Sequence, residues 1–173
     1  MNTTKATDWL MMFFLGYIDE DSMIVNKISE FIEDEKYDLV KDIIAILNPS
    51  LDYNPVDILC RISQSKKKAD VKLQMLTKYI LETTNADIRE KRYKCIRLAI
   101  DNRNMLLIST YIDYLRNRYN QKSDLNDSIY MLTLYTNTKH QFFNIEDSEY
   151  KEFEKIVEYL ELNRSFVNKK LQR

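Results

Sequence analysis

The chain contains one histidine, His140, so any catalytic arrangement with a histidine base must be built around this residue. His140 lies in the polar segment 136–141, which is typical of a helix end or a loop and not of a buried triad. Carboxylates run together at residues 19–21 and 33–35, but nothing in the surrounding pattern would bury them, as paired catalytic acids require. We therefore predict no catalytic residues and no enzymatic activity.

The two cysteines, Cys60 and Cys95, are flanked by apolar residues and are too few for the disulfide framework of a small secreted domain. We predict that they are small buried side chains in a protein of a reducing, cytoplasmic compartment. The chain has no CxxC pair to hold zinc. Its single glycine also excludes the glycine-rich loops that bind nucleotide phosphates. No metal and no cofactor is expected.

Charge is segregated along the chain, although the net charge is only −1. Residues 1–60 carry 4 basic and 12 acidic side chains, whereas residues 61–122 carry 15 and 6. The basic third includes Lys66, Lys67, Lys68 and the segment 89–94, which could bind nucleic acid or an acidic partner. The alternative is a solvated face that the neighbouring acidic third neutralises.

The elements that must carry these residues are helices, because apolar residues recur at three- and four-residue steps and strict alternation is scarce. One such helix begins at Tyr37 and ends before Asn48 and Pro49, since proline cannot continue the helical hydrogen-bond ladder. Pro55 is suited to the first position of the next helix. The fold class predicted is all-α.

One apolar pattern, at positions 1, 3, 4, 7 and 8, occurs three times, beginning at Tyr37, Leu73 and Met105. These starts are 36 and then 32 residues apart, and a weaker fourth copy surrounds Ile156. A shorter apolar helix precedes each copy, at residues 28–32, 56–62, 96–100 and 129–134. Because one pair of short helices cannot bury both apolar faces, neighbouring pairs would stack into a solenoid. The alternative is a compact helical bundle.

The junction between the second and third copies resembles an ankyrin repeat. Asn85 stands where that family has the glycine of its left-handed turn, and Cys95 to Ala99 stand where Pro-Leu-His-Leu-Ala would open the next repeat. Residues 54–59 match the same opening, and the resemblance covers residues 24–165. The loop between Ile88 and Ile96 is about three residues short for the family's projecting β-turn finger, so the resemblance bears on the helix stack and not on the fingers.

The composition, poor in glycine and rich in Lys, Asn, Ile, Asp and Tyr, is similar to that of ankyrin-like proteins of poxviruses and other large DNA viruses. That resemblance implies a viral host-range or immune-evasion factor that binds a host defence or signalling protein.

The predicted organisation is a single all-helical domain over residues 1–173. An apolar N-terminal helix occupies residues 1–23, about four helix pairs occupy residues 24–165, and a short basic tail follows. The apolar run from Trp9 to Ile18 is too short to cross a membrane. It is expected to be a buried helix, with a homodimer contact as the alternative.

The function predicted is a non-enzymatic protein-interaction module. Its contact residues would be charged, polar or aromatic side chains at helix starts and turns that the core does not need: Arg61, Lys68, Arg89, Arg92, Tyr93, Arg97, Asn102 and Arg103. Two alternatives are a viral Bcl-2-like bundle that grips an amphipathic helix, and a nucleic-acid binder built on the basic third. Against the first, Trp9 and Gly16 are both N-terminal, not in a central helical hairpin.

Overall fold

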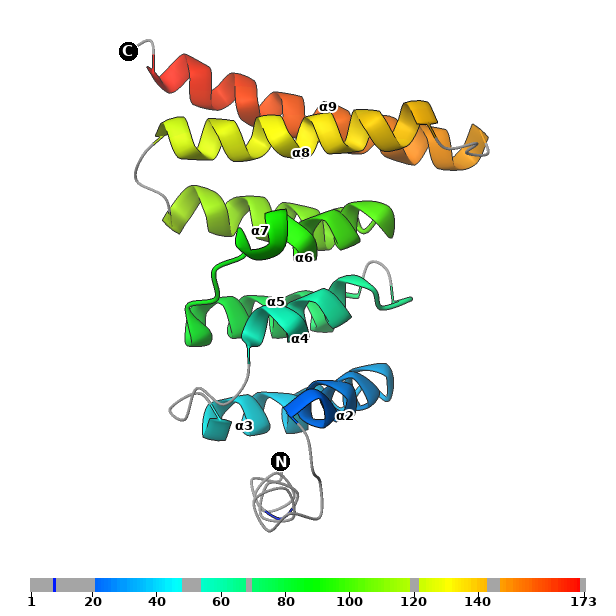
Figure 1. The fold of residues 1–173 in the computed structure, drawn as a ribbon, viewed down its shortest axis with the longest axis vertical. Coiled ribbons are helices and arrows are strands. Elements are labelled where there is room, and N and C mark those ends of the chain that lie inside the picture. Colours follow the sequence, from blue (N-terminus) through cyan, green and yellow to red (C-terminus); the bar gives the residue numbers. More distant parts are fainter. Residues whose placement is uncertain are drawn as a thin grey trace. The chain divides into compact units, whose positions relative to one another are not determined.

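The computed structural model describes residues 8, 21–47, 54–67, 70–118, 122–142 and 147–171. Over these residues the chain forms eight helices and no strand, which confirms the all-α prediction (Figure 1). The helices are α2 (Asp21–Glu33), α3 (Tyr37–Leu47), α4 (Pro55–Ser63), α5 (Val71–Thr84), α6 (Glu90–Asp101), α7 (Met105–Arg118), α8 (Lys122–Phe142) and α9 (Asp147–Leu171). The predicted N-terminal helix and the homodimer contact from Trp9 to Ile18 lie outside the described residues.

The chain divides into two compact units, Met1–Cys95 and Ile96–Arg173, here called unit 1 and unit 2. The boundary falls inside α6, so the first residues of this helix belong to unit 1. None of the described helices is long and apolar enough to cross a membrane.

Unit 1 contains two helix pairs, α2 with α3 and α4 with α5 (Figure 1). The pairs lie against each other, because α2 packs on α4 and α3 packs on α5. The core between them consists of side chains with at most 1% exposure: Ile28, Ile32, Val40, Ile43, Ile44, Leu47, Val56, Ile58, Leu59, Ile62, Leu73, Leu76, Ile80 and Leu81. Burial of aliphatic side chains of this size contributes about 1.5–3 kcal/mol each before the entropic cost of ordering them. Each helix thus buries its apolar stripe against two neighbours.

Capping side chains, one proline and one left-handed residue mark the helix ends in unit 1. Asn54 caps α4, its side chain accepting a hydrogen bond from the Val56 amide, and Pro55 occupies the first turn as predicted. Asp70 caps α5 by accepting bonds from the amides of Lys72 and Leu73. Asn85 ends α5 with φ 53° and ψ 36°, which confirms that it adopts the left-handed conformation.

Two turns, one in each unit, have the same backbone geometry. At the turn from α2 to α3, Glu35 has φ 60°, and the amides of residues 34, 35 and 36 bond to the carbonyls of residues 30, 32 and 31. At the turn from α6 to α7, Arg103 has φ 54°, and the amides of residues 102, 103 and 104 bond to the carbonyls of residues 98, 100 and 99. Glu35 and Arg103 are 68 residues apart. The starts of the first and third apolar patterns, Tyr37 and Met105, are the same distance apart in the sequence. The α4–α5 loop, residues 64–70, is longer than either of these turns.

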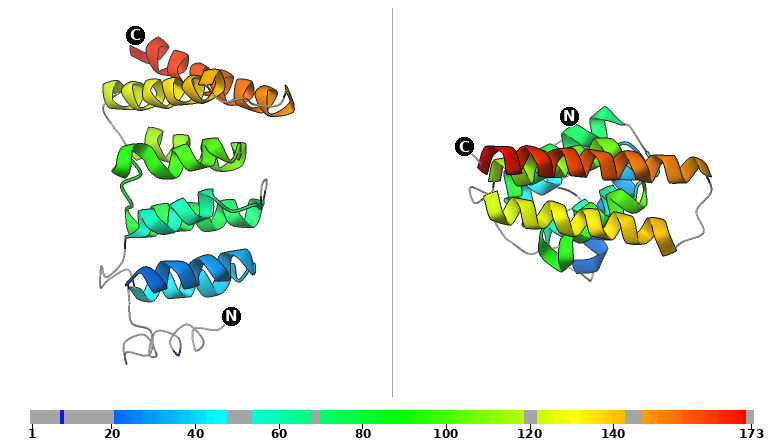
Figure 2. Two further views of the ribbon diagram at one scale, coloured as in Figure 1. Left: turned by 45° about the vertical axis from the view of Figure 1, so that its right-hand side comes forward. Right: turned by 90° about the horizontal axis from the view of Figure 1, so that it is seen from above.

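Unit 2 includes a long helical hairpin, in which α8 packs along α9 (Figure 2). The sequence predicts an apolar helix of only six residues at 129–134, whereas α8 has 21 residues. The additional buried positions of α8 include Ser128, Thr133 and Thr136, whose hydroxyls donate to the carbonyls four residues earlier. Because those polar residues are satisfied within the helix, they can be buried without forming an apolar pattern. The prediction also placed Met75 and Leu134 in apolar patterns, and both are exposed.

Candidate functional site

The first turn of α6 contains an unusual backbone segment. Lys91, Arg92 and Tyr93 all lie in the left-handed region, with φ between 54° and 60°. The left-handed conformation costs roughly 1–2 kcal/mol per non-glycine residue, and it normally occurs at single positions. Such a segment persists only where surrounding contacts enforce it. The right-handed part of α6 follows these three residues.

Two side-chain contacts hold this turn against the beginning of α4. Asn54 Nδ2 donates to Glu90 Oε2 at 2.9 Å, and Lys91 Nζ donates to Asp57 Oδ1 at 2.9 Å. The hydrogen bond and the charge of Asp57 raise the pKa of Lys91, so this lysine is fully protonated at neutral pH. A backbone bond from the Tyr93 amide to the Arg89 carbonyl closes the turn. All of these contacts lie within unit 1.

The side chains of this turn are mainly cationic. Arg89, Lys91, Arg92 and Lys94 are exposed, and Tyr93 is half-buried. Arg89 pairs with Asp87 at 3.1 Å and Lys91 pairs with Asp57, whereas Lys94 has no ion pair with any residue that the structure describes. We call Arg89, Lys91, Arg92 and Lys94 the basic turn. Side chains of these types bind carboxylate or phosphate groups, which arginine recognises in a bidentate manner.

The structure brings three of the predicted contact residues together in this turn, namely Arg89, Arg92 and Tyr93. Arg61 is exposed on α4 and donates to Asn26 Oδ1 at 3.0 Å. Lys68 lies outside the described residues.

The other three predicted contact residues, Arg97, Asn102 and Arg103, belong to unit 2 and are each partly buried. Arg97 stacks over the Tyr135 ring at 5.5 Å. Arg103 is engaged within the unit, since it pairs with Glu152 at 2.7 Å and with Glu149 at 3.4 Å.

The acidic and basic thirds of the sequence meet inside unit 1. Lys67 Nζ lies 3.0 Å from Glu35 Oε1, and Lys91 pairs with Asp57. Two cations of the basic third are therefore offset by carboxylates of the acidic third. These two ion pairs agree with the interpretation that the acidic third neutralises part of the basic third.

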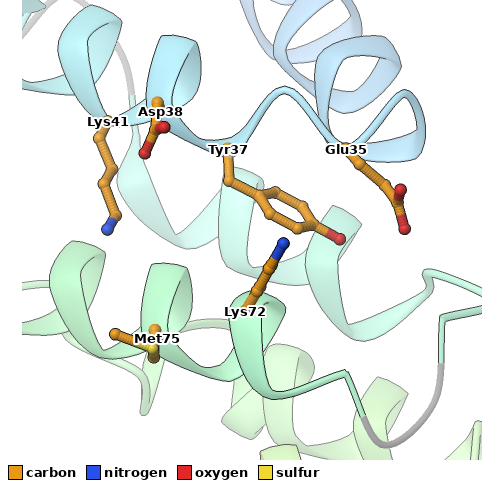
Figure 3. Close-up of a pocket in the computed structure, with 6 residues that line it drawn as sticks. All are labelled: Glu35, Tyr37, Asp38, Lys41, Lys72 and Met75. Carbon is orange, nitrogen blue, oxygen red and sulfur yellow. The ribbon is translucent and has the colours of Figure 1, made fainter. Parts of the chain in front are cut away.

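A feature that sequence reasoning missed is an open pocket of about 350 Å³ at the beginnings of α3 and α5. Figure 3 shows Tyr37, Asp38 and Lys41 on α3 above Lys72 and Met75 on α5. Tyr37, which lines the pocket, also meets the capping aspartate of α5: Tyr37 Oη donates to Asp70 Oδ2 at 2.8 Å. These residues are 33 positions apart, so no local pattern indicates the contact.

The Tyr37–Asp70 contact shifts the pKa of both side chains. Burial and the neighbouring Asp70 raise the pKa of Tyr37. Burial alone would raise the pKa of Asp70, but the bonds from Tyr37 and from two backbone amides, with the charge of Lys67, outweigh it and lower that pKa below 3.8. Asp70 is therefore ionised in the folded protein at all but strongly acidic pH.

Replacing Tyr37 by phenylalanine is expected to destabilise the chain by about 1–2 kcal/mol at pH 7, because it removes a hydrogen bond to a charged group. A lowered folded-state pKa stabilises the protein above the unfolded-state pKa, and this contribution is lost as pH falls through the folded-state value. The difference between wild type and Tyr37→Phe should therefore shrink below about pH 4. Urea unfolding at pH 7 and pH 3 measures it, and a pH-independent difference would show that the hydrogen bond is not to a carboxylate.

The positions of the two cysteines and of the histidine agree with the sequence analysis. Cys60 and Cys95 are free and buried, which confirms the prediction for the thiols. His140 lies in the last turn of α8, in agreement with a position at a helix end. Among the described residues, no group of three or more His, Cys, Asp or Glu side chains could hold a metal ion.

Comparison with known proteins identifies no relative: no family model, no curated protein and no solved structure matches the chain. The ankyrin-like and poxviral resemblances therefore stay predictions, and the argument for function rests on the geometry of the chain itself.

Proposed function

We propose that the protein is a non-enzymatic interaction module and that the basic turn contacts an acidic surface of a protein partner. The observation that carries this proposal is the strained turn itself. Four exposed cations lie within six residues, at and on either side of three successive left-handed residues, and two contacts tie that segment to α4. A turn held in this way would lose little conformational entropy on binding.

The arrangement of helices supports a module of this kind. A stack of helix pairs presents its turns side by side and offers an extended surface to a partner. The two packed pairs of unit 1 and the matching turns at Glu35 and Arg103 favour a helix-pair solenoid over an irregular bundle. If the poxviral resemblance holds, the partner is a host defence or signalling protein.

A protein partner is favoured over nucleic acid because several of the cations are paired with carboxylates. Nucleic-acid binding requires many unneutralised Lys and Arg side chains along the path of the phosphates. Lys67, Lys91 and Arg89 instead pair with carboxylates of the same unit. The basic turn thus offers a small, defined cationic site that matches a short acidic segment.

The test compares two double variants, each of which removes two exposed cations from unit 1. Arg92→Ala/Lys94→Ala alters the basic turn, and Lys72→Ala/Lys78→Ala alters exposed positions of α5. The probe is a glutamate-rich 12-residue peptide, followed by titration calorimetry at low salt. The first variant should weaken binding about fivefold or more, because interface residues of this kind contribute over about 1 kcal/mol, and the second should not.

Two results would overturn the proposal. One is equal binding of the peptide by both double variants, since the attraction would then be unspecific. The other is tighter binding of a 12-base-pair duplex than of the peptide, with a steep loss of affinity as salt increases. That outcome would assign the basic third to nucleic acid.

A further inference from the structure

The outward side of α8 is apolar, although it faces solvent. Tyr130, Met131 and Leu134 are 42%, 55% and 43% exposed. They are spaced at one, three and four residues, so they lie on one side of the helix. The opposite side of α8 is well packed, since Leu125, Ser128, Ile129, Leu132, Thr133 and Thr136 are buried. The exposed apolar residues therefore belong to a well-packed helix and not to a frayed end.

This side of α8 also carries negative charge. Among the α8 residues whose burial the structure describes, the other exposed side chains are Ser123, Asp124, Asp127 and Thr138, with no cation. Asp124 and Asp127 precede Tyr130 and Met131 by three to seven residues, so they flank the apolar group on the same side. Soluble proteins rarely leave a contiguous group of large apolar side chains exposed without a binding role.

Helix α9 extends this surface. Helix α9 lies alongside α8 (Figure 2), and Arg164 of α9 stacks over the Tyr130 ring at 4.8 Å. Going back from Arg164 in alternating steps of three and four residues, the same side of α9 includes Glu161, Val157, Glu154 and Tyr150. Glu154, Glu161 and Tyr150 are exposed. The combined surface has exposed apolar side chains at its centre and four exposed carboxylates around them, with Arg164 as the cation stacked on Tyr130.

We propose that this α8–α9 surface binds a basic amphipathic helix of a partner protein, with Met131 and Leu134 as the central contacts. A helix laid along it would place its apolar stripe over Tyr130, Met131 and Leu134. Its lysines and arginines would face Asp124, Asp127, Glu154 and Glu161. The surface lies in unit 2 and does not depend on the proposed role of the basic turn.

A second copy of this chain is a poorer occupant. In a two-fold symmetric dimer the same patch meets itself, so the carboxylates of one copy would face those of the other. Like charges placed opposite each other across an interface disfavour the pairing. A basic helix instead covers the exposed apolar side chains and places opposite charge beside the carboxylates.

The test uses an 18-residue leucine–lysine peptide with leucine at helical spacing as the probe, and its scrambled sequence as control. Met131→Ser and Met75→Ser form a matched pair, because the two methionines are 55% and 56% exposed on different helices. Both variants should fold normally, since exposed substitutions change stability by less than about 0.5 kcal/mol. Met131→Ser should weaken peptide binding about fivefold or more, whereas Met75→Ser should not.

The electrostatic part of the proposal has its own variant. Asp127→Asn/Glu161→Gln keeps the side-chain shapes and should weaken binding of the leucine–lysine peptide, with a shallower salt dependence than wild type. A leucine–glutamate peptide of the same pattern should not bind.

Three results would overturn the inference: no measurable binding of the leucine–lysine peptide, equal binding of its scrambled form, or equal loss in Met131→Ser and Met75→Ser. Concentration-dependent dimerisation of the chain that Met131→Ser abolishes would also overturn it, by assigning the surface to a second copy.

Discussion

Replacing Leu107 by aspartate is expected to unfold unit 2 and to leave the helix pairs of unit 1 folded. Leu107 is 1% exposed on α7, and a carboxylate there would be buried without a partner. Such substitutions cost more than about 4 kcal/mol, a large share of the stability of a domain of this size. Far-ultraviolet circular dichroism should therefore lose a large part of its helical signal at 25 °C.

The state of unit 1 in this variant decides between the two architectures. In a solenoid, stability is the sum of local units and their nearest-neighbour interfaces, so α2 to α5 can remain folded when unit 2 is lost. In a compact bundle with a single core, the whole chain unfolds together. Hydrogen exchange at the backbone amides of Ile28, Ile44 and Leu76 distinguishes the solenoid from the bundle. Full exchange at these amides in Leu107→Asp would contradict the solenoid.

The control for this experiment is the same substitution at an exposed leucine. Leu162 is 69% exposed on α9, so Leu162→Asp should change the free energy of unfolding by less than about 0.5 kcal/mol. If Leu162→Asp were as damaging as Leu107→Asp, the effect would come from the added charge in general and not from burial of Leu107.

Helical spacing in the sequence predicted the class of the fold because each helix buries a single stripe. Tyr37, Val40, Ile43, Ile44 and Leu47 recur at three- and four-residue steps, and all five are buried on α3. The beginning of α4 at Pro55 and the end of α5 at Asn85 were also predicted, because at each of these positions a single residue determines the backbone conformation. In these places the sequence signal and the structural cause are the same residues.

The features that could not be predicted depend on contacts between distant residues. Tyr37 beside the pocket bonds to Asp70, 33 residues away on the cap of α5, and α8 buries threonines whose hydroxyls bond to carbonyls of their own helix. The apolar surface of α8 was mistaken for core, since an exposed Leu134 has the same spacing as a buried one. Periodicity identifies an apolar stripe but not what covers it.

The left-handed turn at residues 91–93 was also unpredictable, because Lys, Arg and Tyr have no preference for positive φ. Its sequence, from Glu90 to Tyr93, is compatible with an ordinary right-handed helix. The contacts of Asn54 with Glu90 and of Asp57 with Lys91 hold the alternative conformation. The turn thus stores strain of a few kcal/mol at the site proposed to bind a partner, by the estimate of roughly 1–2 kcal/mol per residue.

Arg92→Gly and Arg92→Ala should reveal this strain by the sign of the difference between their free energies of unfolding. Arg92→Gly is expected to be more stable than Arg92→Ala by about 1 kcal/mol, because only glycine lacks the Cβ that clashes at φ 56°. Both variants lose the arginine side chain and its contacts, so those losses cancel in the comparison. In a right-handed helix the order is reversed, with alanine more stable by about 1 kcal/mol.

Lys78, exposed in the middle of α5, gives the matched control. Lys78→Ala should be more stable than Lys78→Gly, opposite in sign to the pair at Arg92, when all four variants are unfolded in urea. If Arg92→Ala were the more stable of its pair, residues 90–101 would form one continuous right-handed helix. The basic turn would then have no fixed backbone, and the rigidity that supports its proposed binding role would be lost with it.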